Sequence, residues 1–248
     1  MPDAVGYRAK IGVIIPSTNT VVEHDYNLMR PHGITFHMGR MYIEDAGASD
    51  DAAFERLIQQ IRASTQIAVR DVMTCEPDHL MMGMSAETFW GGKDGNDAFT
   101  ANIRELSGGL DVTTGADACG VACTTLGIRR VAVLTPYQSV GDAEVHRFFT
   151  DIGLEVVRVE GLKCSSATAI AAVTEPELRD ALRRLDGPDI DGIIQVGTNL
   201  SMLRLADEAE RWLGKPVLAI NAVTLWHALR TLSFDDRVDH AGTLLREH

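Results

Sequence analysis

The chain has 248 residues, of which 45% are hydrophobic, and it carries a formal net charge of −12 at pH 7. This length suits one large domain or two small ones with a sizeable buried core, and the acidic balance argues against a nucleic-acid surface, which needs a basic stripe. No apolar run reaches the roughly 20 residues of a membrane span and the first residues lack a signal-peptide pattern, so we expect a cytoplasmic protein with no membrane partner.

The four cysteines are too few and too scattered to predict a disulfide framework. They are Cys75, Cys119, Cys123 and Cys164. Cys119 and Cys123 lie four residues apart on a predicted helix, but no His or further Cys follows at the spacing of a metal site. We therefore expect reduced thiols and no bound metal.

The first half of the chain alternates apolar runs with amphipathic stretches, which predicts strands joined by helices. Lys10–Ile15 is a β-branched run that ends at Pro16-Ser17-Thr18-Asn19, so it predicts a strand and its loop. Asp50–Thr74 repeats apolar residues at nearly the helical period and has Ser49 or Asp50 as its N-cap. The other elements predicted here are helix Thr20–Met29, strand Ile34–Tyr42, helix Asn96–Leu106 and a weak strand at Leu110–Thr114.

His79–Gly92 is the most informative stretch of this half. Its apolar run stops at Ser85, Ala86 and Glu87, which predicts a buried parallel strand with a polar loop at its carboxyl end. Open α/β sheets bind their ligands at that edge. We therefore expect this loop to form half of an active site.

The order of elements repeats after a predicted helix at Ala116–Leu126. Arg130–Leu134 predicts a strand, and Thr135-Pro136-Tyr137-Gln138 follows it as a polar loop, as in the first half. The remaining predicted elements are helix Asp142–Ile152, strand Leu154–Val159, helix Glu175–Leu185, strand Asp191–Val196, helix Ser201–Leu213, strand Val217–Ile220 and helix Val223–Leu232. Two successive βαβαβ units predict an α/β fold with two pseudo-symmetric lobes, each a mostly parallel sheet flanked by helices.

We expect residues 1–113 with 222–248 to form the first lobe and residues 114–221 to form the second. Right-handed crossovers leave the loops after equivalent strands at one edge of each sheet, so a cleft between the lobes would gather four loops. These loops are Pro16–Thr20, Met84–Glu87, Thr135–Ser139 and Gly197–Asn199.

The four loops are rich in small hydrogen-bonding side chains. Hydroxyls, amides and the backbone N–H groups at helix starts can hold carboxylate oxygens without Arg or Lys. Helix capping is the alternative role for the same side chains. The polar candidates are Ser17, Thr18, Asn19, Ser85, Tyr137, Gln138, Thr198 and Asn199.

Glu87 is the carboxylate nearest to the end of the strand predicted within His79–Gly92. In a dry cleft its pKa would rise toward the range of a working acid or base. A solvated glutamate in the first turn of a helix is the alternative. The sequence has no GxGxxG, P-loop or GxSxG motif, which argues against nucleotide binding and weakens a hydrolase interpretation.

Four segments resemble known enzymes. Ile11–Glu23 resembles the opening of maleate cis-trans isomerases. Met82-Gly83-Met84-Ser85, with Phe89 and Gly91, resembles a loop of arylmalonate decarboxylases. Val131–Tyr137 and Glu208–Val217 are similar to segments of both. Over nearly its whole length the chain thus resembles the aspartate/glutamate racemase superfamily. The resemblance implies two pseudo-symmetric lobes, no cofactor and a small acid bound between the lobes.

The resemblance also implies that Asn19 and Tyr137 contact the substrate. Members of the superfamily typically have one cysteine in each of two facing loops, and these positions fall here at Met84 and at Val196 or Gly197. Neither position holds a thiol. None of the four cysteines lies in a predicted cleft loop, so no thiol mechanism is transferred to them.

The sequence therefore predicts a cofactor-independent lyase or isomerase of a small carboxylic or dicarboxylic acid, of decarboxylase, hydratase or maleate-isomerase type. The expected catalytic residues are Tyr137, Glu87 and Ser85, and the expected substrate-binding residues are Ser17, Asn19, Met84, Gly197, Thr198 and Asn199. Decarboxylation needs only an oxyanion site and one proton donor, so we favour a lyase over a racemase. The alternatives are a small-acid binding or sensor protein, and a hydrolase or C–C lyase that uses Glu87. The sequence leaves open a homodimer or a higher homo-oligomer.

Overall fold

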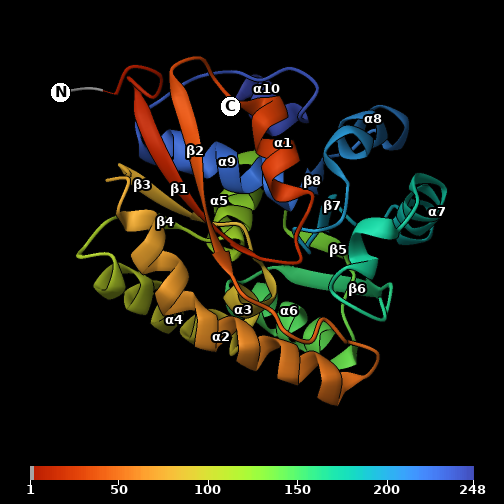
Figure 1. The fold of residues 1–248 in the computed structure, drawn as a ribbon. Helices are drawn as coiled ribbons and strands as arrows, with labels where there is room; N and C mark the ends of the chain where they lie inside the picture. The colour runs from red at the N-terminus through yellow and green to blue at the C-terminus, as the bar shows by residue number, and fades with distance from the viewer. Residues whose placement is uncertain (1–2) are drawn as a thin grey trace.

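A computed structural model of the protein describes residues 3–248 and contains two four-stranded sheets. Every strand pairs in parallel with its neighbours, and the strand orders are β2-β1-β3-β4 and β6-β5-β7-β8 (Figure 1). The second order repeats the first when β5 to β8 take the places of β1 to β4. The predicted α/β fold with two similar lobes is confirmed.

Each sheet has two inner strands, which are largely buried. The first sheet contains β1 (Ala9–Pro16), β2 (Ile34–Met41), β3 (His79–Met82) and β4 (Val112–Thr113), and the second contains β5 (Arg130–Thr135), β6 (Glu155–Gly161), β7 (Gly192–Gln195) and β8 (Val217–Ala219). In β1, Ile11 pairs with Phe36 on one side and His79 on the other. Because helices cover both faces of such a strand, β1 and β5 are continuous apolar runs rather than alternating ones.

The helices flank the sheets and connect successive strands. They are α1 (Val22–Met29), α2 (Asp51–Met73), α3 (Ala86–Phe89), α4 (Gly92–Leu106), α5 (Gly115–Leu126), α6 (Ser139–Asp151), α7 (Glu175–Leu185), α8 (Leu203–Leu213), α9 (Ile220–Thr231) and α10 (Thr243–Glu247), with a short 3₁₀ turn at Ala169–Ala172. Within residues 3–248, no helix combines the length and hydropathy that crossing a membrane requires.

The long helix α2 begins at an N-cap that the sequence predicts. The Asp50 carboxylate accepts the backbone N–H of Ala53 at 2.8 Å, which satisfies one of the free amides of the first turn. Phe54, Leu57 and Ile58 lie on its buried face. This face turns the start of α2 toward the space between the two lobes.

Helix α9 returns the end of the chain to the first sheet. It packs against α1, α5 and α10 and contacts β3 and β4, and Figure 1 shows it beside α1. It also contacts β8 of the second sheet, and α5 falls in the predicted second lobe, so the assignment of residues 222–248 to the first lobe stays a prediction. The helix begins at Ile220 rather than at Val223, because β8 ends after three residues.

Candidate active site

A cavity of about 60 Å³ lies between the lobes, at the carboxyl ends of β1, β3, β5 and β7. This volume is several times the roughly 10–15 Å³ that one buried water needs. Each of the four predicted loops contributes side chains to the cavity. The lining residues are Pro16, Thr18, Asn19, Phe54, Leu57, Ile58, Ile61, Met84, Ser85, Ala86, Tyr137, Ala167, Ile170, Gly197, Thr198 and Asn199.

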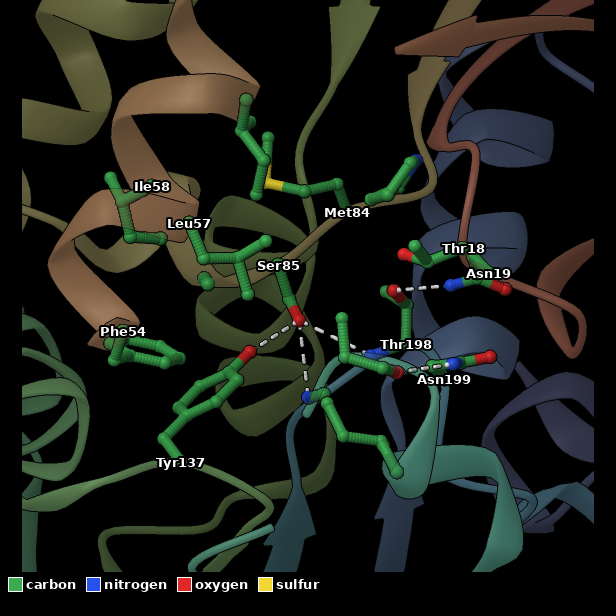
Figure 2. Close-up of a pocket in the computed structure, with 16 residues that line it drawn as sticks. Thr18, Asn19, Phe54, Leu57, Ile58, Met84, Ser85, Tyr137, Thr198 and Asn199 are labelled. Atoms are coloured by element: carbon green, nitrogen blue, oxygen red, sulfur yellow. Dashed lines mark hydrogen bonds between the residues drawn. The ribbon is translucent and has the colours of Figure 1, made fainter. Parts of the chain in front are cut away.

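Ser85 is the centre of the hydrogen bonds in this cavity. Its Oγ lies 2.7 Å from the Tyr137 hydroxyl and accepts the backbone N–H groups of Gly197 at 3.1 Å and Thr198 at 3.3 Å. Figure 2 shows the Ser85 hydroxyl pointing toward Tyr137 and the Thr198 loop. One serine of the first lobe therefore meets two loops of the second.

The count of lone pairs fixes the direction of the Ser85–Tyr137 bond. A serine hydroxyl has two lone pairs and one proton, and the amides of Gly197 and Thr198 occupy both lone pairs. Ser85 therefore donates its proton to Tyr137 Oη, which leaves the phenolic proton free to donate to a ligand. Burial raises the pKa of Tyr137, and the hydrogen bond with Ser85 opposes this rise. The phenol thus remains protonated at neutral pH and is a donor rather than a base.

Asn19 binds backbone amides at the start of a helix and also belongs to the cavity. Its Oδ1 accepts the N–H groups of Val21 and Val22 at 3.0 Å, before the start of α1. Its Nδ2 donates to Thr198 Oγ1 at 3.1 Å, and that hydroxyl donates to the Gly83 carbonyl at 3.0 Å. The sequence offers binding of helix amides and ligand binding as alternative roles for such a side chain. In the structure, Asn19 binds the amides and also lines the cavity.

Asn199 lines the cavity and also connects the lobes. Its Oδ1 accepts the N–H of Thr20 at 3.0 Å, and its Nδ2 donates to the carbonyl of Ala167 at 2.9 Å. Ser17, an expected substrate-binding residue, does not line the cavity, and this expectation is corrected. Its hydroxyl accepts the N–H of Ile43 at 3.0 Å, so the side chain faces the end of β2.

Gly197 is required by its surroundings. Its φ of +94° lies in the left-handed region, and an added Cβ would lie 2.4 Å from Cδ of Pro136. Any side chain here would strain the backbone and collide with that ring. The glycine therefore lets the amides of residues 197 and 198 approach Ser85.

A second wall of the cavity is apolar and adjoins Tyr137, whose ring centroid lies 5.3 Å from that of Phe54. Phe54, Leu57, Ile58 and Ile61 of α2 form it, with Met84 beside them (Figure 2). The sequence predicts these α2 residues as one face of a helix, but its periodicity does not tell a face that packs into the core from a face that lines a cavity. The cavity thus has one wall of neutral donors and one wall of hydrocarbon.

Glu87 lies outside this cavity, which corrects its expected place among the catalytic residues. Its Oε1 forms an ion pair with Arg62 Nε at 2.7 Å, and it lines a separate cavity with Trp90 and Phe99. Burial raises the pKa of Glu87, and Arg62 opposes the rise. The single turn of α3 therefore directs residue 87 away from the side to which Ser85 points.

None of the four cysteines belongs to the residues that line the cavity. Cys119 and Cys123 are buried in α5, where burial raises the pKa of both thiols. Cys75 and Cys164 are partly exposed. Tyr137 is the one ionisable side chain in the described lining, so the cavity offers neutral donors in place of charged groups.

Comparisons with known proteins cover nearly the whole chain. Residues 11–245 match the family model of arylmalonate decarboxylase. The chain is 25% identical to a maleate isomerase of Nocardia farcinica over 247 residues, with 96% of each chain covered. It is 32% identical to an arylmalonate decarboxylase of Bordetella bronchiseptica over 152 residues, which cover 60% of this chain and 62% of the relative.

Solved structures share the same fold. Nocardia farcinica maleate cis-trans isomerase, as a mutant with a covalently bound succinylcysteine intermediate, superimposes with a TM-score of 0.87 at 22% identity, covering 96% of this chain and 98% of that one. Arylmalonate decarboxylase superimposes with a TM-score of 0.79 at 24% identity, covering 95% and 98%. Together with the family match over residues 11–245, they support the predicted superfamily. The chain belongs to the arylmalonate decarboxylase family.

Proposed function

We propose that this protein is a cofactor-independent decarboxylase of a small malonate-type acid. The observation that carries the proposal is the division of the cavity into a wall of neutral donors around Ser85 and an apolar wall on α2. A malonate-type substrate has two carboxylates, of which one is retained in the product and the other leaves as CO₂. The donor wall suits the retained carboxylate, and the apolar wall suits the leaving one. The small cavity favours short substituents on the carbon between the carboxylates.

The retained carboxylate binds at the donor wall. The amides of Gly197 and Thr198 hold Ser85, and Ser85 donates to Tyr137, so the free hydroxyl proton of Tyr137 is the preorganised donor that a carboxylate oxygen meets there. This donor stabilises the negative charge that develops on that oxygen in the transition state. The leaving carboxylate faces Leu57 and Ile58, where it loses its hydration.

The reaction balances with one proton taken up. The bond between the central carbon and the leaving carboxylate breaks, CO₂ departs, and the electron pair forms an enediolate on the retained carboxylate. Tyr137 then donates its proton to the central carbon, and solvent returns a proton to the phenolate. A phenol with a raised pKa is competent for this step, because an enediolate is a far stronger base than a phenolate.

Isomerisation through a cysteine adduct needs a thiol in the site, and racemisation needs a base. A relative of this chain forms a succinylcysteine intermediate, and such an intermediate needs a thiol at the substrate. None of the four cysteines of this chain is among the cavity residues. Racemisation needs a base that takes the proton on carbon, and Tyr137 holds its own proton too strongly for that role. These points favour a lyase over an isomerase.

The direct test is a substrate panel followed by NMR. Methylmalonate, isopropylmalonate, phenylmalonate and maleate are incubated separately with the protein. We expect at least one malonate to lose CO₂ and maleate to remain unchanged. Conversion of maleate with no decarboxylation of the malonates would overturn the proposal.

A small-acid binding protein without turnover is the second candidate, because Tyr137 is the one ionisable group among the cavity residues that lie within 3–248. A ligand would then raise the melting temperature without being consumed, which the same NMR samples reveal. The hydrolase or C–C lyase based on Glu87 is not proposed, since that residue lies outside the cavity. A cytoplasmic location and a homo-oligomeric state stay predictions of the sequence.

A further inference from the structure

Asn221, at the start of α9, joins α1 to the loop that follows β7. Its Nδ2 donates to Asp25 Oδ2 at 2.8 Å and to the backbone carbonyl of Thr198 at 3.0 Å. Both partners are acceptors, so the amide group must face them with its nitrogen. Asn221 is only 3% exposed, and its Oδ1 has no hydrogen-bond partner within residues 3–248.

Asp25 holds the other end of this link. It lies in α1, is 2% exposed, and accepts the Asn221 amide. Burying a carboxylate and leaving an amide oxygen without a partner both reduce stability. A well-packed apolar pair would avoid both penalties. The Asp25–Asn221 pair therefore has a role other than packing the core.

Thr198 connects the Asp25–Asn221 link to the cavity through its hydrogen bonds. Its N–H donates to Ser85 Oγ, its Oγ1 bonds with Asn19 and Gly83, and its carbonyl accepts Asn221. The two backbone dihedrals of a residue decide the direction of its N–H relative to its C=O. With the carbonyl and the side chain held, the Thr198 N–H has one direction, which is toward Ser85.

We propose that Asp25 and Asn221 are positioning residues that hold the Thr198 amide in line with Ser85. Neither residue lines the cavity between the lobes, so they act through the loop rather than on the substrate. The catalytic part of this inference rests on the proposed decarboxylase function. The Thr198 amide holds Ser85, and Ser85 orients the Tyr137 hydroxyl that faces the substrate. A donor aimed at a developing charge matters most in the transition state, so loss of the link lowers kcat and leaves KM nearly unchanged.

The test uses Asn221→Ala with Thr224→Val as the matched control. Thr224 is buried on the same helix, and its hydroxyl donates to Ile220 of that helix. Two readouts are followed: hydrogen exchange of the Thr198 amide by NMR, and kcat and KM for the malonate that is turned over. We expect Asn221→Ala to raise the exchange rate of the Thr198 amide about tenfold and to lower kcat about tenfold. Both changes have the size expected for one weakened hydrogen bond.

Asp25 supplies a second pair of variants in case Asn221→Ala does not fold. Asp25→Asn keeps an oxygen that can accept the Asn221 amide, and Asp25→Ala removes it. We expect Asp25→Asn to stay close to wild type in both readouts and Asp25→Ala to resemble Asn221→Ala.

Two results would overturn the inference: unchanged Thr198 exchange in Asn221→Ala or Asp25→Ala, or equal effects in Thr224→Val. The exchange readout needs no substrate. If the wild-type protein decarboxylates nothing, the proposed function fails, and the exchange rates alone still decide whether Asn221 positions Thr198.

Discussion

The hydroxyl oxygens of Ser85 and Tyr137 lie 2.7 Å apart, although 52 residues separate them in the sequence. Ser85 follows β3 of the first sheet and Tyr137 follows β5 of the second. The hydrogen bond therefore joins the two lobes at the cavity. The donor wall exists only because both lobes contribute to it, and this makes the pair the first target for substitution.

Removal of either hydroxyl should abolish most of the activity. We expect Tyr137→Phe to lower kcat for decarboxylation by roughly 10²–10³-fold, the loss typical of one oxyanion donor. We expect Ser85→Ala to lower kcat as well, because Tyr137 loses the hydrogen bond that orients its hydroxyl. Because the two hydroxyls share one hydrogen bond, the double variant should fall by less than the product of the single effects. Steady-state kinetics measure all three variants, and full activity in Tyr137→Phe would remove its role as proton donor.

Glu87→Gln should leave the reaction intact. Glu87 faces Arg62 on the far side of α3 from the cavity, so we expect kcat/KM to stay within roughly threefold of wild type, less than about 1 kcal/mol of barrier. The pH–rate profile should also keep its shape, although the pKa of Glu87 is raised by burial. A hundredfold loss in a variant with an unchanged circular dichroism spectrum would restore Glu87 to the mechanism.

Asp25 should make stability depend on pH. Burial raises its pKa from 3.8 to about 6, so its stabilising contribution is complete below pH 3.8 and is lost as the pH rises through 6. A rise of the Asp25 pKa from 3.8 to about 6 corresponds to about 3 kcal/mol. Asp25→Asn should therefore be more stable than wild type at pH 8, by up to this amount, and the difference should vanish near pH 4.

Urea unfolding at several pH values measures this difference. The groups that line a surface cavity together with Asp25 are His24, Arg204, Asp239 and His240. They are present in both proteins, so their titration largely cancels in the comparison. A difference that stays constant from pH 4 to pH 8 would contradict the raised pKa.

The apolar wall should set the preferred substituent. Ile58 is 1% exposed and lines the cavity, so Ile58→Ala should lower the free energy of unfolding by about 2–4 kcal/mol. The added space should raise kcat/KM for phenylmalonate relative to methylmalonate. Ile67→Ala is the matched control, because Ile67 is 53% exposed on the same helix. An unchanged ratio in Ile58→Ala would exclude this wall from substrate selection.

The sequence predicts the strands and the donor wall well, for a physical reason. A parallel strand buried on both faces is a continuous apolar run, and the polar residues that end it are easily recognised. Ser85 and Tyr137 stand at two such ends, and the repeat of the βαβ pattern brings those ends to one edge. The sequence alone therefore identifies both residues as candidates.

Other parts of the site escape prediction because they depend on direction and tertiary packing. Helix α3 has one turn, too short for a period to show that Glu87 faces away from the cavity. The inner face of α2 has the same apolar pattern whether it packs or lines a cavity. Asp25 suits the first turn of a helix, and Asn221 lies where the sequence predicts a strand end, so neither suggests the link to Thr198.

The most direct test of the decarboxylase is the fate of 2-ethyl-2-methylmalonate, which has short substituents, in D₂O, followed by ¹H and ¹³C NMR. This substrate has no hydrogen on its central carbon, so background exchange cannot place deuterium there. The proposed function predicts one CO₂ and one 2-methylbutanoate per substrate, with a single deuterium on the central carbon, and loss of this product in Tyr137→Phe. Unconverted substrate, together with conversion of maleate to fumarate by the same protein, would contradict it.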